Sequence, residues 1–110
     1  MPNNGQKLMR ILVFFDLPTV TKADKKCYQV FRKFLIRDGY GMLQLSVYSR
    51  ICNGADNADK HILRLADNIP AKGSVRSICI TDKQYARMQH WAGKPTAAEK
   101  ILKSQQLVLI

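Results

Sequence analysis

One carboxylate of this sequence lies where sheet proteins often place a functional side chain. Asp16 follows the apolar run Ile11 to Phe15 and precedes Leu17-Pro18, so it ends a predicted strand. One carboxylate is a weak Mg²⁺ site, whereas two copies facing each other across a dimer axis suit an ion that takes few protein ligands and keeps its waters. Two such carboxylates resist joint ionisation without a cation, so the site should tighten as pH rises. The alternative is that Asp16 is a turn residue before the proline.

The second candidate for chemistry is a set of basic residues centred on residues 22–37. Lys and Arg number 18 against 8 Asp and Glu, which leaves a formal net charge of +10. This excess favours a polyanionic partner, and the scarcity of aromatic residues among the bases favours contact with a duplex backbone over stacking on single strands. The alternative is a solvated surface without a ligand. The candidate phosphate contacts are Lys22, Lys25, Lys26, Arg32, Lys33, Arg37 and Arg76, and further bases of the set are Arg10, Arg50 and Lys72.

Other residue types that often do chemistry lack suitable partners. The cysteines are odd in number and form no C-x-x-C pair: Cys27, Cys52 and Cys79. This spacing argues against a disulfide framework or a structural zinc site, and it favours reduced thiols in the cytoplasm. His61 and His90 have no metal-ligand partner at i+4, so we interpret them as core or surface histidines.

The elements that position the candidate residues follow from periodicity and from start and stop signals. Residues 8–16 predict a central strand buried on both faces. Thr21 with Asp24 three residues later predicts a capping box that opens a helix, and Gly39 predicts its end. Apolar side chains at helical spacing predict the buried face of this helix: Ala23, Cys27, Val30, Phe31, Phe34 and Leu35.

A strand region and a second helix follow. Residues 42–51 alternate between apolar and polar, which predicts a half-buried strand long enough to bend into two. Its apolar face carries Leu43, Leu45 and Val47. The second helix is predicted to start near Asp56 or Asn57 and to stop before Pro70. The residues that it turns inward are Ala58, Ile62, Leu65 and Ile69.

The last part of the chain predicts two more strands around a short helix. Residues 75–81 form one strand, and Thr81 with Gln84 resembles a capping box for the helix. The helix is predicted to carry Tyr85 and Met88. The apolar residues 107–110 predict a strand that either closes its own sheet edge or pairs with a second subunit, the option that we favour.

This element order predicts a ferredoxin-like α+β sandwich, βαββαβ with an additional C-terminal strand. The first strand should lie centrally, with the helices on one face of the sheet. We assign residues 8–110 to a single domain, preceded by a disordered or loosely ordered N-terminus at residues 1–7. The longest apolar run, Ile11 to Phe15, is far shorter than the roughly 20 residues of a membrane span, so we expect a cytoplasmic protein without a membrane partner.

The order of several motifs resembles one known family. Residues 11–18 (ILVFFDLP) are followed by a basic helix and by residues 39–48 (GYGMLQLSVY), and then by residues 75–78 (VRSI) and 81–84 (TDKQ). Together these motifs resemble the Cas-two family of small CRISPR-associated adaptation proteins, most closely the variety that accompanies type II systems. The resemblance covers nearly the whole chain from about Leu8 to Ile110.

The resemblance implies a homodimer whose C-terminal strands pair with the partner's sheet. The dimer would bridge two dimers of the Cas-one integrase and hold duplex prespacer DNA for integration into the CRISPR array, in antiviral defence. Asp16 matches the family's strand-end Asp, which with its dimer mate can hold a divalent metal, here Mg²⁺. Many members carry Arg at the start of the first helix, where this chain has Lys22, Lys25 and Lys26. The resemblance therefore supports a charge role for these residues more than a bidentate phosphate clamp.

Different classes of function remain open at this point. In the first, the dimer is a DNA scaffold and the chemistry belongs to the integrase. In the second, a pair of Asp16 carboxylates holds Mg²⁺ in an endoribonuclease or endonuclease, the activity that the family label names, although the sequence offers no identifiable general base. A minor alternative is a general RNA-binding domain without a CRISPR connection, which predicts tight binding without an integrase.

Overall fold

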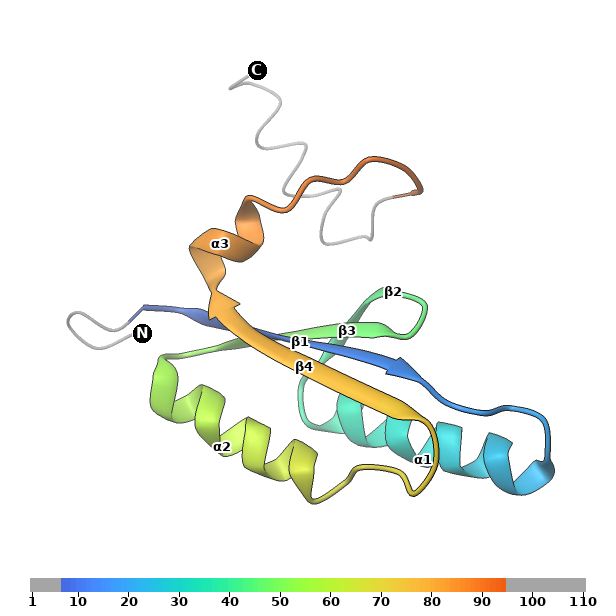
Figure 1. The fold of residues 1–110 in the computed structure, drawn as a ribbon. Helices are drawn as coiled ribbons and strands as arrows, with labels where there is room; N and C mark the ends of the chain where they lie inside the picture. The colour runs from blue at the N-terminus through green and yellow to red at the C-terminus, as the bar shows by residue number, and fades with distance from the viewer. Residues whose placement is uncertain (1–6, 95–110) are drawn as a thin grey trace.

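The computed structural model describes residues 7–94, which form four strands and three helices (Figure 1). In chain order the elements are β1 (Met9–Asp16), α1 (Lys22–Arg37), β2 (Gly41–Gln44), β3 (Val47–Cys52), α2 (Ala55–Ala66), β4 (Ser74–Thr81) and α3 (Asp82–Ala86). The predicted C-terminal strand at 107–110 lies outside the described residues, as does nearly all of the predicted N-terminal segment 1–7.

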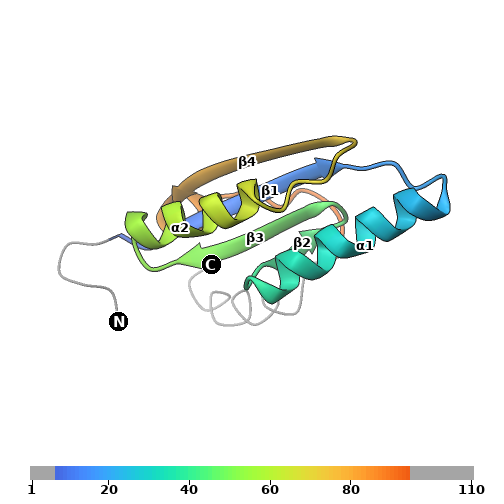
Figure 2. The same cartoon turned by 90° about the horizontal axis from the view of Figure 1, so that it is seen from below.

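The strands form one antiparallel sheet in the order β2-β3-β1-β4, so the prediction that the first strand lies centrally is confirmed. Helices α1 and α2 both cover one side of this sheet, and α3 lies on the other side beyond the end of β4 (Figures 1 and 2). The predicted ferredoxin-like α+β fold is confirmed. Among residues 7–94, no helix combines the length and the apolar composition that crossing a membrane requires.

The core lies between the sheet and the two long helices. Successive side chains of a strand point to opposite faces, and in β1 the odd-numbered Ile11, Val13 and Phe15 are buried on the helix side. The Phe15 ring meets the Phe31 ring of α1 edge to face at 5.2 Å and stacks on the Tyr48 ring of β3 at 5.6 Å. These aromatic contacts add to the burial of apolar area that stabilises the fold.

Local signals set the helix boundaries largely as predicted. Both capping boxes form: Thr21 with Asp24 opens α1, and Thr81 with Gln84 opens α3. Gly39 follows the C-cap of α1 with a φ of +92°, a conformation that glycine adopts without steric cost. Helix α2 starts at Ala55, slightly earlier than predicted, because Gly54 serves as its N-cap.

The predicted buried face of α1 is only partly right. Phe31, Phe34 and Leu35 are buried, but Ala23, Cys27 and Val30 are exposed, with Val30 at 60%. Ala23 and Cys27 are exposed because the N-terminal turns of the helix project past the end of β1, where the sheet does not cover them (Figure 2). Val30 is exposed for another reason: it lies one helical step of about 100° from the buried Phe31, at the edge of the face that packs on the sheet. The half-buried Tyr28 extends the core instead of Cys27.

Three further side chains differ from the predictions. Residues 42–51 do bend into two strands, and Leu45 sits at the hairpin turn, 78% exposed, instead of sharing a face with its neighbours. Ile69 is partly exposed because α2 ends at Ala66. Met88 lies beyond the end of α3 at Ala86 and is also partly exposed.

Strand β1 is not fully buried on its second face. Leu12 is 5% exposed there, but Phe14 is 39% exposed. The prediction of burial on both faces is wrong for Phe14, because within residues 7–94 no helix packs over that part of the sheet (Figure 1).

Candidate functional site

Asp16 is the last residue of β1, and its main chain pairs with Ser74 at the start of β4. Because side chains alternate along a strand and Phe15 points toward the helices, the Asp16 side chain lies on the sheet face opposite α1 and α2. The residue is exposed, and no Lys, Arg or His among residues 7–94 lies within ion-pair distance of its carboxylate. Asp16 is therefore a free carboxylate within the described chain, available to a ligand.

The face that carries Asp16 is largely apolar, and we call it the open face. Register and alternation define its members: Arg10, Leu12, Phe14 and Asp16 on β1, Val47, Ser49 and Ile51 on β3, and Ser74, Arg76, Ile78 and Ile80 on β4. Phe14, Ile51 and Ile78 are 39%, 44% and 50% exposed. Within residues 7–94 no element covers the middle of this face, and an exposed apolar sheet face of this kind marks an interaction surface.

Each end of the open face carries an arginine, and the two arginines have different surroundings. At one end the Arg10 guanidinium donates to Asp82 at 2.9 and 3.2 Å and lies over the Tyr85 ring at 4.2 Å, which fixes α3 to the sheet. At the other end, Arg76 pairs with Phe14 in the register and so shares a face with Asp16. The sequence groups Arg76 with the bases of α1, whereas the register puts it on the opposite side of the sheet from α1, on the face that carries Asp16.

Among the described residues, a divalent metal site at Asp16 would need a second copy of the chain to supply further ligands. No group of three or more His, Cys or Asp/Glu side chains among residues 7–94 could hold an ion within one chain. Asp16 supplies one exposed oxygen ligand, and a second copy would supply another, leaving the remaining positions of an octahedral ion to water. The donor chemistry fits Mg²⁺ on that condition.

Five of the predicted phosphate contacts form one exposed surface, which we call the α1 basic surface. Their spacing places them within one arc of the helix: Lys22, Lys25, Lys26, Lys33 and Arg37. None of them forms an ion pair with another side chain of the described part. Asp24 is the acidic residue in the first turn of this helix, where its carboxylate accepts a hydrogen bond from the Thr21 N–H at 3.1 Å and forms no ion pair with the described bases.

Other predicted bases hold the fold together. Arg32 is half-buried, and its Nε donates to the Tyr48 hydroxyl at 3.1 Å. Arg50 donates to the carbonyls of Asp38 at 2.6 Å and Ile51 at 2.7 Å. These two guanidinium groups tie α1 to the sheet, so their positive charge is partly committed to internal acceptors.

A polar cluster that sequence reasoning missed lies between the two long helices. The Asp38 carboxylate meets His61 Nδ1 at 2.8 Å and accepts from Arg64 Nη1 at 2.9 Å. His61 is 2% exposed and lies on the same face of α2 as Ala58 and Leu65. The available signal was a histidine within an apolar stripe, which must find a hydrogen-bond partner when buried.

Burial shifts the pKa of several groups around this cluster. Partial burial raises the pKa of Asp38, but the hydrogen bonds from His61 and Arg64 outweigh it and hold the pKa below its ordinary value. Burial, assisted by the charge of Asp38, raises the pKa of Tyr40 to about 12. Burial likewise raises the pKa of the Cys52 thiol, so this thiol is protonated and unreactive near neutral pH.

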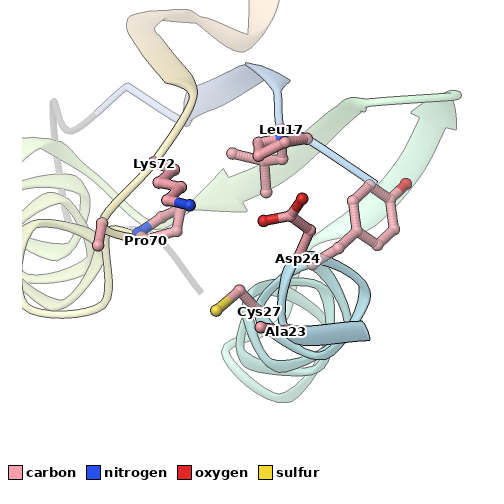
Figure 3. A pocket seen from close by; sticks show the side chains of 9 residues that line it. Leu17, Ala23, Asp24, Cys27, Pro70 and Lys72 are labelled. Atoms are coloured by element: carbon pink, nitrogen blue, oxygen red, sulfur yellow. The ribbon is translucent and has the colours of Figure 1, made fainter. Parts of the chain in front are cut away.

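A cavity of about 120 Å³ lies on the helix side, between the start of α1 and the α2–β4 loop. Its lining is mainly apolar: Leu17, Pro18, Ala23, Asp24, Cys27, Tyr28, Pro70, Ala71 and Lys72. Figure 3 shows the Asp24 carboxylate and the Lys72 ammonium reaching into it from opposite sides. Leu17 directly follows Asp16, so this cavity adjoins the strand end that carries the candidate metal ligand.

The family is decided by comparison with known proteins. A family model described as CRISPR associated protein Cas2 matches residues 9–88, which run from the start of β1 to just beyond α3. The chain belongs to the Cas2 family. The match covers Asp16, Arg76 and every base of the α1 basic surface. Membership sets aside the alternative of an RNA-binding domain without a CRISPR connection.

Relatives of this Cas2 chain match it over most of its length and carry the name CRISPR-associated endoribonuclease Cas2. The relative from Acidovorax ebreus is 54% identical over 101 residues, 92% of this chain and 99% of its own. The relative from Flavobacterium psychrophilum is 42% identical over 107 residues, 96% and 91% of the two chains. A third, from Parvibaculum lavamentivorans, is 45% identical over 86 residues, 78% and 85% of the two chains.

Proposed function

We propose that this Cas2 protein acts in CRISPR adaptation as a homodimer that bridges the Cas-one integrase and holds duplex prespacer DNA during spacer acquisition. The α1 basic surface carries the proposal, because five exposed cations on one helix face, without ion-pair partners in the described chain, suit a polyphosphate backbone. The chemistry of integration then belongs to the integrase.

Two features support the homodimer. The open face presents Phe14, Ile51 and Ile78 to solvent, and a second copy would bury them in an isologous interface. Strand β4 lies at the edge of the described sheet, where an added strand would satisfy its free main-chain groups. The apolar residues 107–110 are the segment that we expect to supply that strand from the partner.

DNA binding is tested by the salt dependence of affinity for a short duplex. Lys26→Ala and Lys33→Ala should each weaken binding for every sequence and reduce the slope of log K against log salt by about one unit, because each lysine releases counterions from a phosphate. The matched control is Lys83→Ala on α3, which removes the same charge on the other side of the sheet. Equal effects at all three positions would contradict the α1 basic surface. The same titration with duplex RNA establishes the preferred nucleic acid.

The second candidate is a Mg²⁺-dependent endoribonuclease or endonuclease. It is favoured by the name of the relatives and by the exposed Asp16 carboxylate on the open face. When bound between two Asp16 side chains, Mg²⁺ supplies Lewis-acid chemistry for phosphodiester hydrolysis. Arg76 shares this face with Asp16, which supports a role for its guanidinium in holding a phosphate oxygen of the substrate.

The two candidates diverge in cells that also express the integrase. Spacer acquisition is compared between wild type and Asp16→Ala, after confirming that the variant still dimerises. Persistent acquisition supports the scaffold, whereas lost acquisition with an intact dimer and integrase complex supports a direct role for Asp16. An absence of acquisition in wild type would contradict the adaptation proposal itself. In vitro, chelator-sensitive cleavage that Asp16→Ala abolishes supports the nuclease, and cleavage that survives this change points to a contaminant.

A further inference from the structure

The main chain beside Asp16 is crowded by a glycine. Gly73 directly precedes Ser74, the β4 residue that pairs with Asp16, and its φ is +91°. An L-Cβ built on Gly73 would lie 2.6 Å from the Asp16 carbonyl oxygen and 2.8 Å from Leu17 Cδ2. Real Cβ atoms essentially never approach other heavy atoms that closely, so a side chain at this position would force a displacement.

The displacement would fall on the main chain where Asp16 pairs with Ser74, because two of the three close contacts are main-chain atoms: the Asp16 carbonyl oxygen and Leu17 Cα, the latter at 3.1 Å. The Leu17 side chain borders the cavity of about 120 Å³ and has space to move away. The Asp16 carbonyl belongs to the main chain of the last paired residue of β1, which has no such freedom. The carboxylate that we propose as a metal ligand is carried by the same residue.

A small shift of Asp16 matters more for a shared metal than for an ordinary surface carboxylate. Mg²⁺ requires near-ideal octahedral geometry at about 2.0–2.1 Å. In a two-fold dimer each displacement occurs twice, once on each side of the ion, so the error in the separation of the two carboxylates doubles.

We propose that Gly73 is a positioning residue that sets the place of Asp16 for divalent-metal binding by letting the α2–β4 loop approach the end of β1. This inference rests on the metal site proposed above. The position should exclude every L side chain, because a residue with a Cβ meets both the crowding and the unfavourable φ.

The test is binding of Mn²⁺, as a spectroscopic substitute for Mg²⁺, to the dimeric full chain, measured by electron paramagnetic resonance. We expect Gly73→Ala to weaken Mn²⁺ binding by about tenfold or more, in the range seen when a group that orients a metal ligand is lost. Asp16→Asn should abolish the signal of bound Mn²⁺ and identifies the site.

Gly93→Ala is the matched control. Gly93 has a φ of +96°, so alanine meets the same backbone strain, but its nearest contact would be His90 Nε2 at 3.7 Å. It should keep the wild-type affinity within about twofold, since only strain and no collision with Asp16 is introduced. Gly73→Asn and Gly93→Asn form a second pair if alanine prevents folding, because asparagine tolerates positive φ better while still carrying a Cβ.

The outcomes separate the two proposals. Wild-type affinity in a folded, dimeric Gly73→Ala or Gly73→Asn protein would overturn the role of Gly73 and leave the metal site standing. An equal loss in the Gly73 and Gly93 variants would also overturn it, because strain alone would then explain the effect. Absence of Mn²⁺ binding in the wild-type dimer would overturn the metal site and this inference with it.

Discussion

Asp16 and Asp38 each stand at the end of a secondary-structure element, and the fold treats them in opposite ways. Asp38 caps α1, is largely buried, and is held by His61 and Arg64. Asp16 ends β1, is exposed, and meets no cationic side chain of the described residues within ion-pair distance. A carboxylate whose partners lie within the fold stabilises the fold, whereas one left without partners is available to a ligand or a second copy.

The largest difference should appear when each carboxylate is removed. Asp38→Ala leaves His61 buried without its partner, and we expect the free energy of unfolding to fall by about 3 kcal/mol. Asp16→Ala removes an exposed side chain and should change it by no more than about 0.5 kcal/mol. Urea unfolding at one protein concentration measures both, because the proposed dimer would make apparent stability depend on concentration. Equal losses would erase the distinction between the two carboxylates.

The next largest effect should be the loss of stability in acid that arises from the Asp38 carboxyl group. The folded state lowers the pKa of Asp38, so its contribution is fully present above the ordinary pKa of about 3.9 and is lost as pH falls through the lower value in the folded state. Stability should therefore decline below about pH 4, and Asp38→Asn should make the decline shallower than in wild type. Thermal unfolding between pH 2 and pH 6, roughly the window set by carboxyl pKa values, measures this slope. Parallel slopes would contradict the assignment.

The smallest effect concerns a phenol next to the same cluster. The Tyr40 hydroxyl is buried, and it has no hydrogen-bond partner in the described chain. Tyr40→Phe should raise the free energy of unfolding by up to about 1 kcal/mol at neutral pH, because it removes an unsatisfied polar group. Since the pKa of Tyr40 is raised from 10.0 to about 12, stability in wild type should also fall as pH rises through that interval, and the variant should lose this fall.

Tyr48→Phe should change the free energy of unfolding in the opposite direction to Tyr40→Phe, although both residues lie in the same core. Its hydroxyl accepts from Arg32 Nε at 3.1 Å, so this change breaks a hydrogen bond and should cost about 1 kcal/mol. Chemical unfolding of the two variants side by side measures both changes. Two changes of the same sign would show that the hydroxyl environments are not as different as the hydrogen bonding indicates.

Local signals in the sequence were sufficient for most of the fold. The two capping boxes indicate the starts of α1 and α3, Gly39 indicates the end of α1, and the apolar run before Asp16 indicates the central strand. The exposed side of α1 could not be delimited, because periodicity does not reveal how far a helix projects beyond its sheet. Ala23 and Cys27 are therefore predicted to lie inside although they are exposed.

The candidate site was predictable in its residues but less so in their grouping. Asp16 and the lysines of α1 could be found from residue type and spacing. The placement of Arg76 on the same face as Asp16 depends on the pairing of Phe14 with Arg76, a register between strands that are far apart in sequence. The contact between Gly73 and the Asp16 carbonyl depends on the same pairing and has no local signal.

The pairing of β1 with β4 also constrains how the protein folds. Met9 lies opposite Thr81 in the sheet, and Arg10 donates to Asp82 across 72 positions of the chain. The central strand β1 is thus synthesised early, but it can pair with β4 only after most of the chain has been synthesised. Such non-local contacts require a large loop to close before they gain energy, so folding should be slow compared with helical proteins of the same length. Until β4 arrives, β1 presents an apolar edge, and the nascent chain is then most exposed to aggregation.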